Sequence, residues 1–228
     1  SMTGSDGSGE DSSASVLIRD GGELCLDRVY PDATFVKYVA SLQLTGMEPV
    51  DFTVSTGGVL RANYKKDHKF CGGVNASFTV DGGSVIATNT IFYSHGARFR
   101  MKGGSWYAKE IGITRSTARG GRMTMTGGDV RLADALSLQC SPDGEFDLLG
   151  GRMDVARLSC QAGACRVLVS GGVLKAAALD FKYDEKTKGG RAWFGILGSD
   201  ADVTVDAVQG PPPGETLTTS AFWDYRFD

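Results

Sequence analysis

The chain lacks most of the features that assign a protein to a familiar functional class. It has no run of roughly 18 apolar residues, so no membrane-spanning helix is expected. Only two histidines occur, and neither stands in a zinc, kinase or nucleophile-elbow motif. The net charge is −3 with no basic stripe, which argues against a nucleic-acid partner. We therefore predict no cofactor, no metal site and no catalytic residue.

Cysteine is also sparse and has no metal-binding spacing. The five cysteines are Cys25, Cys71, Cys140, Cys160 and Cys165, and no two of them form a CxxC pair. They fit either buried thiols or one or two disulfides of an oxidising compartment. Cys160 and Cys165 flank a short glycine-containing segment that can reverse the chain, so we predict a disulfide between them, with Cys140 as the rival partner.

Glycine, in contrast, is abundant, with 32 of 228 residues, about double the usual share. Gly-Gly pairs begin at positions 21, 57, 82, 103, 127, 150 and 171, and a degenerate Gly-Ser begins at 198. Each pair fits a turn that needs a positive φ rather than a phosphate cradle, since no P-loop lysine and hydroxyl follow it. A repeat of this length predicts a stacked architecture.

Aligning the repeats on the glycines reveals four apolar columns. The first two contain Phe78, Phe99, Met123, Phe146, Val167 and Phe194, and then Val80, Met101, Met125, Leu148, Val169 and Ile196. After the glycines come Val85, Trp106, Val130, Met153, Leu174 and Ala201, and then Ala87, Ala108, Leu132, Val155, Ala176 and Val203. Alternation with a period of two predicts strands that bury one face. The repeats at 21 and 57 carry one extra residue before the glycines.

Two architectures fit these strands, namely a β-solenoid and a series of antiparallel hairpins turning at each Gly-Gly. The polar positions favour the solenoid, because in it three columns of charge alternate in sign from coil to coil. These columns are Arg122, Glu145 and Arg166; Arg131, Asp154, Lys175 and Asp202; and Asp129 and Arg152. Opposed unlike charges on neighbouring strands stabilise a sheet, and like charges repel. We therefore predict an all-β, parallel, single-stranded β-solenoid of about eight coils.

The two ends of the chain depart from the repeat. Residues 1–15 have almost no large apolar residue and are predicted to be a disordered linker of a longer protein, leaving 16–228 as the solenoid domain. Residues 27–50 are interpreted as an insert that caps the first coil, and residues 208–228 as a C-terminal cap. In that cap, Trp223, Tyr225 and Phe227 are expected on one face of a last strand.

Units such as MTMTGGDVRLADALSLQC and VLVSGGVLKAAALDF resemble the Gly-Gly repeats of bacterial autotransporter passenger domains and autotransporter-associated β-strand repeats. The resemblance covers about residues 50–207. It implies a right-handed parallel β-helix that is secreted or displayed on the cell surface. The five cysteines and the long insert at 27–50 depart from this pattern.

The remaining functional candidates are aromatic. Trp106 falls in a core column, whereas Trp193 and Tyr107 each neighbour an inward residue and are expected to point outward, where they are candidates to bind a glycan. The outward acids Asp129, Glu145, Asp147, Asp154 and Asp202 alternate with basic residues, which suits structural pairing better than catalysis. We predict a structural or adhesive module, not an enzyme, whose partner is a glycan or a cell-surface protein. The alternative is a carbohydrate-binding or polysaccharide-cleaving β-helix.

Overall fold

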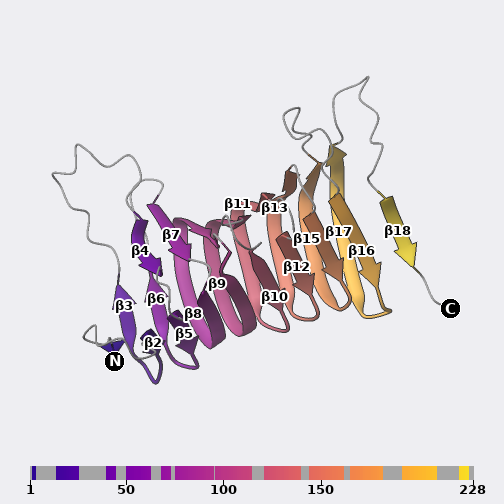
Figure 1. The fold of residues 1–228 in the computed structure, drawn as a ribbon. Helices are drawn as coiled ribbons and strands as arrows, with labels where there is room; N and C mark the ends of the chain where they lie inside the picture. The colour runs from indigo at the N-terminus through magenta and orange to yellow at the C-terminus, as the bar shows by residue number, and fades with distance from the viewer. Residues whose placement is uncertain are drawn as a thin grey trace.

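The computed structural model describes residues 2–3, 14–25, 40–44, 50–62, 68–72, 75–94, 96–114, 121–139, 144–161, 165–181, 192–209 and 221–225. These residues form strands and turns and contain no helix. Figure 1 shows the strands stacked side by side along one axis, with the N-terminal strands at one end and β18 at the other. The chain winds repeatedly through the same set of strand positions, so each element contacts its counterpart one repeat away.

Three parallel ladders run along this axis. The first ladder, before the glycine bends, consists of β2 (Ala14–Ile18), β5 (Val50–Ser55), β8 (Ala76–Tyr93), β9 (Arg98–Thr114), β10 (Arg122–Met125), β12 (Gly144–Leu148), β14 (Cys165–Val169), β16 (Ala192–Leu197) and β18 (Ala221–Tyr225). The second ladder, after the bends, consists of β3 (Glu23–Cys25), β6 (Val59–Arg61), the middle of β8 and β9, β11 (Asp129–Gln139), β13 (Arg152–Gln161), β15 (Gly172–Phe181) and β17 (Ala201–Gln209).

The third ladder starts with β4 (Ala40–Leu44) and β7 (His68–Gly72) and continues through the C-terminal parts of the long strands from β8 to β17. The short strand β1 (Met2–Thr3) pairs with β2 and is the one antiparallel strand among the described pairings. Because the other pairings are parallel and join different repeats, the β-solenoid is confirmed, and the alternative of separate antiparallel hairpins is wrong.

The apolar columns of the sequence become continuous ladders of buried side chains. Phe78 pairs with Phe99, and the first column continues in register to Phe194. Trp106 is fully buried, as predicted, and its ring lies 4.9 Å from Phe78 and 5.0 Å from Phe92, measured between centroids. Burial of one such ring stabilises a fold by about 1.5–3 kcal/mol, so these columns provide the main force that holds the coils together.

The Gly-Gly pairs make the sharp bends between the first and second ladders, which line the lower edge of the stack in Figure 1. Gly151 has a φ of 84°, which side chains with a Cβ rarely adopt. The preceding residue, Gly150, has to be glycine for a different reason. A Cβ there would lie 2.7 Å from the carbonyl oxygen of Thr126 in the preceding bend. One glycine therefore supplies the conformation and the other permits close stacking.

The last repeat corrects one part of the predicted register. Leu174 pairs with Val203 rather than Ala201, and Ala176 pairs with Val205 rather than Val203. The bend there contains Ser199 and Asp200 in a turn after Gly198, so two more residues are used before the second ladder resumes. Consequently Asp202 lies opposite Val173, and the charge column of Arg131, Asp154 and Lys175 continues to Thr204.

The chain ends are described only in part. Within the insert at 27–50, Ala40–Leu44 form β4 and pair in parallel with β7, so this part belongs to the stack itself. At the other end, β18 pairs with β16 and extends the first ladder, which confirms a last strand around Trp223. Phe227 and most of the predicted linker at 1–15 lie outside the described residues. The predicted caps stay predictions.

Candidate functional site

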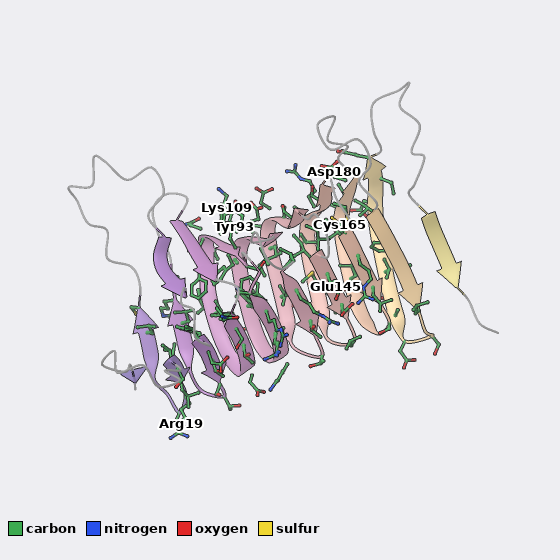
Figure 2. All side chains as sticks on the ribbon, in the orientation of Figure 1. Arg19, Tyr93, Lys109, Glu145, Cys165 and Asp180 are labelled. Carbon is green, nitrogen blue, oxygen red and sulfur yellow. The ribbon has the colours of Figure 1, made fainter. Side chains whose placement is uncertain are left out.

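One highly charged outward surface lies on the first ladder, and we call it the arginine face. It consists of Arg98, Arg100, Arg122, Glu145, Asp147 and Arg166. These residues alternate with the buried first and second columns, so the pleat directs them away from the core. Glu145 is labelled in Figure 2, on the sheet formed by the strands of the first ladder. Register pairing places the six side chains on four consecutive strands, from β9 to β14.

Four of these residues form a closed ion-pair network. Glu145 lies 3.4 Å from a guanidinium nitrogen of both Arg122 and Arg166. Asp147 accepts a hydrogen bond from Arg122 and another, at 3.2 Å, from Arg166. The hydrogen bond to Asp147 raises the pKa of Arg122 above its ordinary value. Two cations and two anions are therefore neutralised within the network, and the predicted alternation of Arg122, Glu145 and Arg166 is confirmed.

Asp147 is the buried centre of this network. Its side chain is 5% exposed, whereas the side chains of Arg122 and Arg166 are 49% and 41% exposed. The sequence assigned Asp147 only to the outward set of acids. Its burial follows from the two long arginine side chains that lie over it from the strands on either side.

Arg98 and Arg100 differ from the rest of the face. Among the described residues, no hydrogen bond or ion pair reaches either guanidinium group. Arg98 lies directly opposite Arg122, so the alternation of sign is broken at this step. Arg100 lies between Thr79 on one side and Thr124 on the other. The alignment of repeats contained this signal, since Arg98 precedes Arg122 in the same column.

The second ladder carries its own charged strip. The predicted columns are in register, with Asp129 opposite Arg152 and Arg131 opposite Asp154. The ion pairs, however, form within strands: Arg131 lies 2.9 Å from Asp129, and Arg152 lies 3.3 Å from Asp154. Residues two apart on one strand face the same side, so long arginine side chains can reach along the strand as well as across it.

The structure does not bring the two predicted aromatic residues together. Tyr107 belongs to the second ladder, where its half-buried ring lies 5.5 Å from the guanidinium carbon of Arg131. Trp193 belongs to the first ladder, in β16 opposite Arg166. Four strand spacings, about 19 Å, separate β9 from β16 along the axis. A single aromatic strip containing both residues is therefore not formed, and the ligand role of each stays a prediction.

A second group of charges lies where the second ladder meets the third. Glu110 is half-buried, and its pKa is raised by burial, an effect opposed by a hydrogen bond with Ser137 and reinforced by Asp134 nearby. Asp134 forms an ion pair of 3.2 Å with Arg157. Glu110 is thus a carboxyl group that is protonated more readily than usual and lies near a second, arginine-paired carboxylate.

The predicted disulfide partners lie close together in the core. Cys160 and Cys165 are both 2% exposed, and the Cys165 Sγ donates to the carbonyl oxygen of Leu138 at 3.3 Å. Burial raises the pKa of Cys160, and the neighbouring Cys165 raises it further. The two buried sulfur atoms therefore lie near one another, and the disulfide between them stays a prediction. Cys140 lies outside the described residues.

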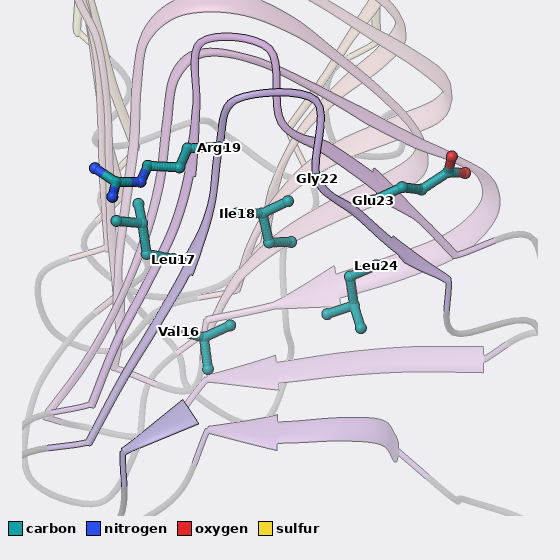
Figure 3. Close-up of a pocket in the computed structure, with 7 residues that line it drawn as sticks. All are labelled: Val16, Leu17, Ile18, Arg19, Gly22, Glu23 and Leu24. Carbon is teal, nitrogen blue, oxygen red and sulfur yellow. The ribbon is translucent and has the colours of Figure 1, made fainter. Parts of the chain in front are cut away.

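A hollow lies at the N-terminal end of the stack, and Figure 3 shows the seven residues that line it. Val16, Ile18 and Leu24 point into the hollow, whereas Arg19 and Glu23 point away from it. The inward residues continue the apolar columns of the core. Among the described residues, the hollow is therefore the end of the core in the first coil, and its lining has no converging polar groups that would orient a ligand.

No protein-family model, curated protein or solved structure matches this chain. In the part of the chain that the structure describes, no helix is long and apolar enough to cross a membrane. The same residues contain no cluster of three or more histidine, cysteine or acidic side chains arranged to hold a metal ion.

Proposed function

We propose that the chain is a structural or adhesive module of a secreted or surface-displayed bacterial protein, and that it is not an enzyme. The observation that carries this proposal is the in-register stacking of outward side chains on three parallel ladders. Such stacking repeats about every 4.8 Å, so the outward side chains are presented at regular spacings along the axis. The Gly-Gly repeats that resemble autotransporter passenger domains support the extracellular location.

A rigid rod with a binding face is the mechanism that follows. The buried columns are continuous from β5 to β16, so bending the rod would open the core between coils. The outward ion pairs hold four side chains of the arginine face in place, namely Arg122, Glu145, Asp147 and Arg166, without using backbone groups, which are already paired in the ladders. Binding then requires little ordering of the protein, which favours affinity.

The pairing of the acids supports a structural role over acid–base chemistry. Asp129, Asp134, Glu145, Asp147 and Asp154 each lie within ion-pair distance of an arginine. Carboxylates engaged in this way are held by the fold, which suits structural pairing better than proton transfer to or from a substrate.

The test is binding of the whole chain to a glycan array and to a panel of cell surfaces, with cleavage of polysaccharides assayed in parallel. Binding without cleavage is the expected result. Failure to bind any glycan or surface would contradict the adhesive role, and turnover of a polysaccharide would contradict the non-enzymatic one.

One observation favours the alternative of a polysaccharide-cleaving β-helix, namely the raised pKa of Glu110 beside Asp134. Glycosidases use a carboxylic acid of raised pKa together with a second carboxylate. If the chain does cleave a polysaccharide, Glu110→Gln is expected to abolish the cleavage. Asp202→Asn, at an exposed acid in the last repeat and outside the arginine face, is the control and should leave it unchanged.

A further inference from the structure

The arginine face has a surplus of positive charge at one end. Arg122 and Arg166 are balanced by Glu145 and Asp147. Arg98 and Arg100 have no such partner within the described ranges. Arg98 also lies opposite Arg122, and like charges directly opposite one another destabilise a sheet. An anion bound beside Arg98 would restore the alternation of charge that the rest of the column shows.

We propose that Arg98 and Arg100 bind an anionic group, carboxylate or sulfate, of an acidic polysaccharide. The two arginines are two residues apart on β9, so their Cα atoms are about 6.8 Å apart on one face of the strand. Two long guanidinium side chains at that spacing can converge on one oxyanion. Guanidinium groups bind such anions through paired hydrogen bonds.

The residues around the two arginines suit a sugar chain. Thr79 and Thr124 lie on either side of Arg100 in register, where their hydroxyls can exchange hydrogen bonds with sugar hydroxyls. Ser77, next to Arg98, donates its hydroxyl to Asp51. The surface thus offers positive charge flanked by neutral hydroxyl groups. The carboxylates on that side are already engaged, because Asp81 of the adjacent β8 forms an ion pair with Lys102 and Asp51 accepts a hydrogen bond from Ser77.

The other polyanions fit this surface less well. A peptide cannot add a strand beside these arginines, because β9 is paired with β8 on one side and with β10 and β11 on the other. Acidic peptides are also bound by arginine clusters, and polyglutamate is included in the experiment to test that mode. Nucleic acids and anionic membranes require broad basic surfaces or clusters of about 4–8 basic residues. This chain has a net charge of −3, and the unbalanced part of the face comprises two arginines.

The inference rests on the proposed adhesive function and is tested with the whole chain. Its binding to immobilised heparin, polygalacturonate, neutral dextran and polyglutamate is measured by biolayer interferometry. The variant Arg98→Ser/Arg100→Thr places at each position the residue type that the neighbouring strand already carries, so the fold should be retained. The control Arg131→Ser/Lys175→Thr removes two cations from the second ladder and changes the net charge equally.

We expect the wild-type chain to bind heparin or polygalacturonate but not dextran. Tighter binding of heparin would identify sulfate as the preferred anionic group, and tighter binding of polygalacturonate would identify carboxylate. Loss of the two arginines should weaken binding by about tenfold or more, whereas the control should stay within about threefold of wild type. Equal binding by the arginine variant and the wild type would overturn the site. Binding of polyglutamate at least as tight as that of either acidic polysaccharide would overturn the ligand class.

The same measurements separate the inference from the proposed function. A chain that binds no polyanion but binds a neutral glycan or a cell surface on the arrays retains the adhesive function and loses this site. A chain that binds nothing in either experiment loses both. The circular dichroism spectrum and melting temperature of each variant verify that a lost signal reflects binding rather than unfolding.

Discussion

Replacing Asp147 by alanine should destabilise the chain more than any other single change in the arginine face. Asp147 is nearly fully buried and accepts hydrogen bonds from Arg122 and Arg166. A hydrogen bond to a charged group contributes about 1.5–3 kcal/mol. Both arginines are 41–49% exposed and regain water when the carboxylate is removed, so the expected loss is near the lower end, about 2 kcal/mol.

For a chain of this length, a loss of about 2 kcal/mol lowers the melting temperature by roughly 4–8 °C. Thermal unfolding followed by far-ultraviolet circular dichroism measures this shift. Glu145→Ala is the matched control, because Glu145 contacts the same two arginines but at 3.4 Å and with a side chain that is 27% exposed. Its expected cost is below about 1 kcal/mol and should shrink in high salt, whereas that of the buried Asp147 should persist.

A double-mutant cycle between Asp147→Ala and Arg122→Ala is expected to give a coupling of about 0.5–3 kcal/mol. The reasoning is refuted if Asp147→Ala and Glu145→Ala have the same effect, or if the cycle gives no coupling while both single variants remain folded. Either result would mean that the burial of Asp147 does not strengthen its ion pairs.

Glu110→Gln should stabilise the chain at about pH 8 and leave its stability at about pH 4 nearly unchanged, because burial raises the pKa of Glu110 above 4.5 and stability is lost as pH rises through that raised value. Urea unfolding at both pH values measures this, and an equal effect at the two would contradict it. Gly151→Ala should cost about 1–3 kcal/mol, since φ is 84° and the new Cβ would lie 2.6 Å from a backbone oxygen; an unchanged urea midpoint would count against the close stacking of bends. Iodoacetamide at neutral pH should modify the exposed Cys25 quickly and Cys160 only after unfolding, because burial raises the pKa of Cys160. Peptide mass mapping identifies the modified residue, and it also shows whether the unreduced chain contains the predicted Cys160–Cys165 bond.

The sequence determined the architecture because a stacked fold repeats its constraints. Each repeat has to bury the same face and bend at the same place, so the apolar columns and the glycine pairs return at regular positions. Opposite charges at Glu145 and at Arg122 and Arg166 then distinguished parallel stacking from hairpins, since only stacking places these residues on adjacent strands. For most residues of the repeats, the column, the buried or exposed face of the strand and the partner on the next strand were therefore predictable from local patterns alone.

The tertiary structure decided the register of the last repeat and the partners of the charged side chains, which the spacing of residues in the sequence does not encode. A bend that is two residues longer, at Ser199 and Asp200, shifted the register of the last repeat, because only strand pairing shows where a ladder resumes. The aligned columns already put Trp193 before a bend and Tyr107 after one, but only strand pairing showed that the segments before and after the bends form separate ladders. Burial of Asp147 depends on which side chains lie over one another, and pairing between strands shows that no described carboxylate lies directly opposite Arg98 or Arg100. Long charged side chains have many rotamers, and their partners are selected by neighbours on other strands rather than by position in the chain.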